Sequence, residues 1–307
     1  MELFGCGTAL TTPFRPDGTV DEHALHAQVN AQIESGIELL VPCGTTGEAA
    51  TLTDAETRRV VEITCAVSSG RVPVFAGCTH NSTAVAVEKA ARLSRVPGLT
   101  GLLTANPYYN RPGQEGQYQH FKAVAEATDL PVLLYNIPGR TGTNLEPETV
   151  LRLAELPNVV GIKESSGNMI QITELLTIAP RSFRIFAGDD ALALPILALG
   201  GAGLISVASN VIPAQMADMV RAAIANDWAS ARRINRHFFR LMQAHFWEPS
   251  PAPVKAVMAI LGRGTEAMRL PMVPVSSGTR HKLEMLLGEL GLMVEAPAGR
   301  SDNQRMF

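Results

Sequence analysis

The sequence predicts a (β/α)8 TIM barrel with a C-terminal helical domain, and three observations support this prediction. Within residues 1–226, eight short apolar runs alternate with stretches of helical periodicity, which is the rhythm and size of such a barrel. The runs are apolar at consecutive positions, as expected for parallel strands that are covered on both faces. From residue 227 onward only helical patterns follow.

Helix-start signals separate the predicted strands. Thr53 caps a helix whose first turn contains Asp54 and Glu56, and the polar residues 81–83 open the next helix. A doubly wound sheet is the competing architecture, but the first run, GCGTAL, lacks the third glycine of a dinucleotide-binding turn. In chain order, the strands are predicted at residues 5–10, 38–43, 73–77, 101–105, 131–136, 159–163, 184–187 and 203–208.

We expect three parts along the chain: a catalytic barrel at 1–226, a helical domain at 227–293 and a frayed tail at 294–307, which is polar and has no periodicity. The first helix of the second part is basic and amphipathic. Its apolar face suits packing on a core better than binding to a membrane surface. Three helices are predicted there, at residues 228–247, 253–261 and 277–292.

Charge and composition exclude several classes of protein. The net charge of −3 argues against a broad nucleic-acid-binding surface. The first residues lack a signal-peptide pattern, and the longest apolar stretch, 191–205, contains Pro195 and is too short to span a bilayer. We therefore expect a cytoplasmic protein with no membrane or nucleic-acid partner. Four cysteines without CxxC spacing are expected to be reduced core thiols rather than disulfides of a secreted chain, at Cys6, Cys43, Cys65 and Cys78.

Lys163 is the strongest candidate for a catalytic residue, because it ends the apolar run VVGIK at the predicted mouth of the barrel. Burial disfavours the charged form of a lysine, and a neutral amine is a nucleophile that forms an imine with a ketone. The alternatives are a lysine that extends to solvent or one that pairs with the adjacent Glu164.

Hydroxyl groups near other strand ends suggest a proton relay. Tyr135 ends the neighbouring strand, where a phenol beside an imine acts as general acid and base if further hydroxyls, from Thr45 and Tyr109, connect to it. The GTTGE turn at 44–48 offers backbone N–H groups and the hydroxyl of Thr46 to a carboxylate. Arg140 could bind a second carboxylate. Packed hydroxyls, an ordinary turn and a surface arginine are the respective alternatives.

Signals for metals and cofactors are weak, so we expect neither. The pair Asp189-Asp190 has no further carboxylate or histidine cluster at ligand spacing, and a helix N-cap explains it better. The glycine-rich residues 200–203 precede the last strand and so lie at the wrong end of the barrel for a phosphate site.

Five motifs in this order resemble the dihydrodipicolinate synthase / N-acetylneuraminate lyase family. They are GTTGE at 44–48, PYYNRP at 107–112, YNIPGRTG at 135–142, GIKES at 161–165 and GDD at 188–190. The resemblance covers the chain from about Gly5 to Leu292 and implies a homotetrameric barrel, a dimer of dimers, in which a lysine forms an imine with pyruvate.

The resemblance also assigns roles to particular residues. It implies that Lys163 forms the Schiff base and that Tyr135 is the proton donor and acceptor, with Thr45 and Tyr109 as relay partners. Tyr109 would reach the site of the neighbouring subunit. The remaining implied contacts are those of Thr46 and the backbone of Ile205 with pyruvate, and of Arg140 with the carboxylate of the aldehyde.

Within the family, the two threonines of GTTGE, the Tyr108-Tyr109 pair and Arg140 resemble the synthases. This implies condensation of pyruvate with L-aspartate-4-semialdehyde to 4-hydroxy-tetrahydrodipicolinate, the first committed step toward diaminopimelate and lysine. Two alternatives remain open. One is a lyase acting on a sialic acid or a 2-keto-3-deoxy sugar acid, and the other is a non-catalytic sensor barrel.

One departure from the family pattern concerns feedback inhibition. Lysine-sensitive members bind lysine through two histidines and a glutamate, whose positions here are Asp54, Thr57 and Val85, although Asn81 is kept. A buried ammonium would lack partners at such a site. The sequence therefore predicts weak or absent inhibition by lysine.

Overall fold

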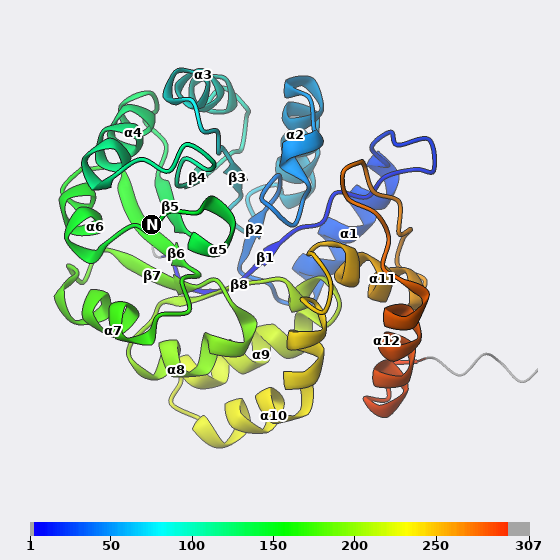
Figure 1. Cartoon of the computed structure of the whole chain (residues 1–307). Coiled ribbons are helices and arrows are strands. Elements are labelled where there is room, and N and C mark those ends of the chain that lie inside the picture. Colours follow the sequence, from blue (N-terminus) through cyan, green and yellow to red (C-terminus); the bar gives the residue numbers. More distant parts are fainter. Residues whose placement is uncertain (1–2, 294–307) are drawn as a thin grey trace, which may run out of the picture.

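Eight parallel strands form a barrel surrounded by helices in the computed structural model, which describes residues 3–293 (Figure 1). The predicted tail at 294–307 lies outside the described residues. The strand order is β2-β1-β8-β7-β6-β5-β4-β3, and the fold class predicted from the sequence is confirmed. The strands are β1 Gly5–Ala9, β2 Leu39–Val41, β3 Phe75–Gly77, β4 Gly101–Ala105, β5 Val132–Asn136, β6 Val159–Glu164, β7 Arg184–Ala187 and β8 Gly203–Ser206.

The barrel closes between β2 and β3, where a single parallel bridge pairs Leu40 with Val74. Beyond this bridge, the amide of Gly77 donates to the carbonyl of Pro42 at 2.9 Å. Gly77 is required there, because a Cβ at this position would collide with the backbone of Cys43.

The helices around the strands begin where the sequence offers caps. The Asp21 side chain accepts from the amide of Ala24, and Thr53 and Glu56 form a capping box. A short helix after β5, which the sequence analysis did not predict, begins at Pro138, a residue favoured at a first helical position. The barrel helices are α1 Glu22–Glu34, α2 Asp54–Ser68, α3 Thr83–Leu93, α4 Gln114–Glu126, α5 Pro138–Thr141, α6 Pro147–Ala154, α7 Met169–Ile178, α8 Ala193–Ala198 and α9 Pro213–Ile224, with 3-10 turns η1 Ala49–Thr51, η2 Asp190–Leu192 and η3 Ala208–Asn210.

Three helices follow the barrel: α10 Trp228–Ala244, α11 Ala252–Ile260 and α12 Ser277–Glu289. Each begins within one residue of its predicted start. Helix α10 packs against α8 and α9, and α11 packs against α12 at one side of the barrel (Figure 1). Buried side chains of all three helices belong to the same hydrophobic cluster as side chains of the barrel. The division of the chain at residue 226 remains a prediction.

The interior of the barrel is packed with alternate residues of the strands, as the period of two requires. This layer contains Leu39, Val41, Phe75, Leu103, Leu133, Tyr135, Phe186 and Ile205. A larger cluster lies between the strands and the surrounding helices. All four cysteines are buried there as free thiols, as predicted from their spacing.

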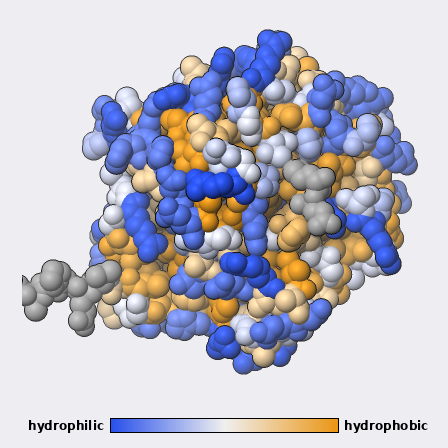
Figure 2. Space-filling view, turned by 180° about the vertical axis from the view of Figure 1, so that it is seen from behind, coloured by the Kyte–Doolittle hydropathy of each residue, from blue (hydrophilic) through white to orange (hydrophobic). Residues whose placement is uncertain are grey.

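The outer surface mixes both kinds of side chain. Seen from behind, hydrophobic residues form patches separated by hydrophilic ones (Figure 2). Exposed large hydrophobic residues occur one or two at a time on several elements, which is ordinary for a globular protein. Over residues 3–293, none of the helices combines the length and the apolar character needed to cross a membrane.

Candidate active site

Lys163 and Tyr135 lie side by side inside the mouth of the barrel. They are paired in register on the adjacent strands β5 and β6, so both side chains point to the same face of the sheet. The Nζ atom of Lys163 lies 4.5 Å from the centroid of the Tyr135 ring. Both residues are almost completely buried, with exposed fractions of 4% and 6%. The structure therefore brings together the predicted nucleophile and the predicted proton donor.

Room for the Lys163 side chain depends on Gly188, the residue after β7. A Cβ built on Gly188 would lie 2.9 Å from Cε of Lys163 and would also collide with Oγ of Ser165. That hydroxyl is buried and has no hydrogen-bond partner among the described residues. Glycine at position 188 therefore leaves space for the Lys163 side chain to extend across the end of β7.

Glu164 does not pair with Lys163, because successive residues of a strand point to opposite faces. Its carboxylate accepts from Nδ2 of Asn136 at 3.0 Å and from the amide of Ser166 at 2.5 Å. Burial raises the pKa of Glu164, and these hydrogen bonds partly offset that rise. The alternative in which Lys163 is neutralised by Glu164 is wrong.

The GTTGE turn follows β2 at the same end of the barrel. The amide of Gly47 donates to the carbonyl of Gly44, and the amide of Glu48 donates to that of Thr45, both at 3.1 Å. Thr46 is buried, whereas Thr45 is exposed. The Thr12 hydroxyl, at the end of β1, donates to the carbonyl of Gly47 at 2.7 Å and attaches the turn to the barrel.

The side chains of Tyr109, in the loop after β4, and of Arg140, on α5, are exposed rather than buried in the barrel interior. The Tyr109 side chain is 88% exposed, and its φ of 74° lies in the left-handed region that few non-glycine residues adopt. Its amide donates to the carbonyl of Thr141 at 3.4 Å. Within residues 3–293, no hydrogen bond joins Tyr109 to Tyr135 or Thr45, so the relay remains a prediction. Nη2 of Arg140 donates to the carbonyl of Ser250 at 3.2 Å.

The two aspartates at the end of β7 have structural partners. Asp189 caps η2 through the amide of Ala191, as predicted. Asp190 is buried and accepts from the hydroxyl of Ser206 and from the amides of Val207 and Ala208. Burial raises the pKa of Asp190. In the described part of the chain, no group of three or more His, Cys, Asp or Glu residues could hold a metal ion.

Comparison with known proteins identifies the family. The model of the dihydrodipicolinate synthetase family matches residues 2–290. The chain belongs to this family. It is 62% identical to the 4-hydroxy-tetrahydrodipicolinate synthase of Acidobacterium capsulatum, over 97% of this chain and 99% of the relative. It is also 55% identical to the 4-hydroxy-tetrahydrodipicolinate synthase of Koribacter versatilis, over 96% of this chain and 99% of that relative.

Solved structures of dihydrodipicolinate synthases have the same fold. The chain resembles the crystal structure of the enzyme from Aquifex aeolicus with a TM-score of 0.93 and 39% identity, over 96% of this chain and all of that one. It also resembles the chloride-inhibited enzyme from Acinetobacter baumannii complexed with pyruvate. The TM-score is 0.92 and the identity 38%, over 94% of this chain and 99% of that one. These likenesses support the synthase over the lyase and sensor alternatives.

The buried ion pair between Lys255 and Glu48 was not predicted from the sequence. Nζ of Lys255, on α11, contacts the carboxylate of Glu48 at the end of the GTTGE turn. Both side chains are almost fully buried. The signal that singled out Lys163, a lysine within an apolar run, is equally present in residues 252–260, APVKAVMAI. This lysine lies outside the barrel strands, on α11.

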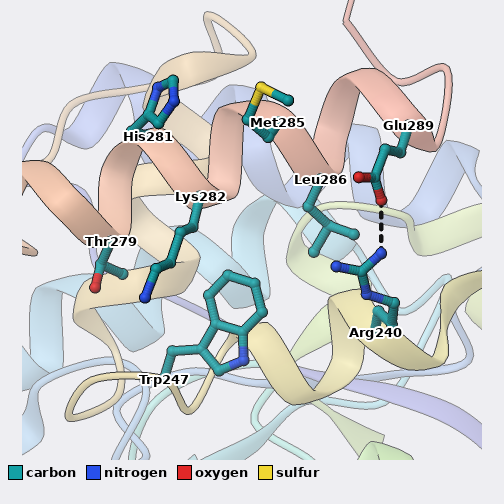
Figure 3. A pocket seen from close by; sticks show the side chains of 8 residues that line it. All are labelled: Arg240, Trp247, Thr279, His281, Lys282, Met285, Leu286 and Glu289. Atoms are coloured by element: carbon teal, nitrogen blue, oxygen red, sulfur yellow. Dashed lines mark hydrogen bonds and ion pairs between the residues drawn. The ribbon is translucent and has the colours of Figure 1, made fainter.

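A hollow between α10 and α12 contains none of the predicted site residues. Its lining includes Trp247, Lys282 and Met285 (Figure 3). Arg240 and Glu289, at one end of it, pair with each other at 2.6 Å and are exposed. Lys163 and Tyr135, the predicted catalytic pair, lie at the barrel mouth and do not line this hollow.

Proposed function

We propose that the chain is a 4-hydroxy-tetrahydrodipicolinate synthase, which condenses pyruvate with L-aspartate-4-semialdehyde through a Schiff base on Lys163. The single observation that supports this most is the buried Nζ of Lys163 beside the ring of Tyr135. An amine in this position is shielded from water and has a phenol within reach. The names of the relatives from Acidobacterium and Koribacter agree with this function.

The chemistry follows from these two groups. The amine of Lys163 adds to the ketone carbon of pyruvate, and water leaves to give an imine. Loss of a methyl proton gives an enamine, whose carbon attacks the aldehyde carbon of the second substrate. The amino group of that substrate then adds to the imine carbon and displaces the Lys163 amine, which closes the ring and releases the product. Tyr135 supplies and accepts the protons of these steps, because its ring lies beside the reacting nitrogen.

Substrate carboxylates would be bound at the rim of the barrel. Thr46 would offer its hydroxyl and the start of the GTTGE turn its backbone amides to pyruvate, together with the backbone of Ile205 on β8, two strands from β2. Arg140 lies on α5 above the end of β5, where its guanidinium suits the carboxylate of the aldehyde. Thr45 would extend the proton relay from Tyr135.

We also propose a homotetramer that is a dimer of dimers. The phenol of Tyr109 is exposed, on a backbone with a positive φ, and points away from the interior of its own barrel. It would complete the relay in the neighbouring subunit, so that the dimer is the smallest active unit. Sedimentation velocity of Tyr109→Phe, beside its kinetics, separates a loss of assembly from a loss of the hydroxyl.

A cytoplasmic location is proposed as well. Four buried free thiols are typical of a reducing compartment. Fractionation of the source cells, followed by detection of the chain, tests this proposal directly.

The deciding experiment is turnover of both substrates, coupled to the downstream reductase and measured as loss of NADPH. We expect consumption that requires both substrates. Borohydride with pyruvate should label the parent protein and the control variant Lys282→Ala, whose lysine is exposed on α12, but not Lys163→Ala. Labelling without turnover would favour a sugar-acid lyase, and absence of labelling would overturn the imine mechanism.

A further inference from the structure

A lysine of the helices after the barrel reaches the GTTGE turn. Lys255 is on the first turns of α11, and its Nζ contacts the carboxylate of Glu48, which ends the turn after β2. The exposed fractions of the two side chains are 3% and 2%. A fully buried ion pair is rare unless further hydrogen bonds satisfy its atoms. Such a pair also holds its two side chains in one geometry.

The remaining contacts of the pair come from different parts of the chain. Nζ of Lys255 donates to the carbonyl of Ala267 at 2.9 Å and lies 4.4 Å from the centroid of the Phe14 ring. The second carboxylate oxygen of Glu48 accepts from the amide of Arg269 at 3.3 Å. The loop between α11 and α12 and the loop after β1 therefore both enclose the pair.

Arg269 attaches the same loop to the start of α2. Its guanidinium donates to both carboxylate oxygens of Glu56, at 2.5 and 2.9 Å, and to the carbonyl of Thr51 at 2.7 Å. Glu48 itself has a φ of 54°, in the left-handed region that favours glycine. The residue is held in this conformation from outside the barrel, by contacts with residues more than 200 positions away.

We propose that Lys255 is a positioning residue: through its buried ion pair with Glu48 it fixes the 44–48 turn, and with it the hydroxyls of Thr45 and Thr46, at the mouth of the barrel. The helices after the barrel thus set the geometry of the site without contacting substrate. The amide of Glu48 donates to the carbonyl of Thr45, so a shift of Glu48 moves the adjacent threonines.

The test uses Lys255→Met, the double variant Lys255→Met with Glu48→Gln, and the control Arg240→Met. The single variant leaves the carboxylate of Glu48 buried and unpaired, which could prevent folding. The double variant removes both charges and is therefore included as the variant that should still fold. Arg240 forms an exposed ion pair with Glu289 in the same group of helices and lies in none of the predicted sites. Each full-length protein is first checked for its unfolding temperature.

Hydrogen exchange of the amides of residues 44–51 is the first measurement, because it needs no substrate. We expect exchange at least about tenfold faster in the folded Lys255 variants, with α12 unchanged and with no effect of Arg240→Met. Exchange within about twofold of the parent in the double variant would overturn the proposal.

The kinetic measurement rests on the proposed function. We expect kcat/KM for pyruvate to fall about 10- to 100-fold in the double variant, with a raised KM from displaced Thr46 and a lowered kcat from displaced Thr45. Faster exchange with unchanged kinetics would overturn the positioning role. Faster exchange in a protein whose parent lacks the condensation activity would overturn the proposed function and leave the structural link between Lys255 and the turn intact.

Discussion

Two of the chain's five lysines, Lys163 and Lys255, are buried, and their different surroundings give them different chemistry. Lys163 has an aromatic ring beside it and a carboxylate on the opposite face of its strand, so its amine is not held in an ion pair, as the proposed imine chemistry requires. Lys255 contacts a carboxylate directly, and although burial lowers its pKa, the charge of Glu48 opposes that shift. Burial alone therefore does not identify a nucleophile; the partner of the amine does.

Gly188→Ala tests how closely the reactive lysine is confined. The added Cβ would displace Cε of Lys163 or the hydroxyl of Ser165, and a misplaced amine reacts slowly. We expect borohydride labelling by pyruvate to slow and kcat/KM to fall about 100-fold, with the fold retained. Gly288→Ala, where a Cβ meets open space on α12, is the matched control. Equal activity of both variants would show that the Lys163 side chain is not confined by residue 188.

At the scale of elements, the strands were the most predictable part of the fold. Each observed strand begins and ends within two residues of its prediction, because runs such as GLLTA at Gly101–Ala105 are mostly apolar and are followed closely by Pro or Gly, here Pro107. Helix α5 was missed because four residues give no periodicity. The ion pair between Glu48 and Lys255 was missed because contacts between residues far apart in the chain leave no local pattern.

Helices α2 and α3 contain Asp54, Thr57 and Val85, the positions that the resemblance associates with inhibition by lysine. Here Asp54, at the start of α2, pairs with Arg92 of α3 at 2.8 Å, and Thr57 is buried within α2. Val85 offers an apolar side chain on α3. None of these groups supplies a free anionic partner for an ammonium ion.

We therefore expect little inhibition of the condensation by lysine. The measurement is the initial rate with increasing lysine at fixed pyruvate and semialdehyde, beside a lysine-sensitive synthase in the same assay. Half-inhibition at sub-millimolar lysine would mean that other residues of these helices bind the amino acid.

At the scale of the whole molecule, acid stability depends on histidines that fold in the neutral form. His245, at the end of α10, is fully buried, and burial lowers its pKa to about 3. Burial also lowers the pKa of His120 to about 4. The unfolded chain binds protons at these residues below its ordinary histidine pKa of about 6.5, whereas the folded chain does not. The free energy of unfolding should therefore decrease as the pH falls below that value.

Urea unfolding at pH 8 and pH 5 tests this dependence. We expect the folded state to lose about 2 kcal/mol for His245 alone between these values. His245→Phe should reduce the difference between the two pH values, whatever its effect at either one. His281→Gln, at an exposed position of α12, should leave the difference unchanged. An equal pH dependence in His245→Phe would mean that other groups dominate.

The closure between β2 and β3 has a mechanical consequence. One bridge pairs these strands in register, whereas β5 and β6 pair at five positions. If the barrel wall were stretched by an external force, this boundary would separate first, since it has the fewest bonds to break. The loop after β2 is attached to Lys255 of α11 and to Arg269, and these contacts lie on the β2 side of that boundary. Under such a force, the helices after the barrel would hold the end of β2 in place while β3 separates from it.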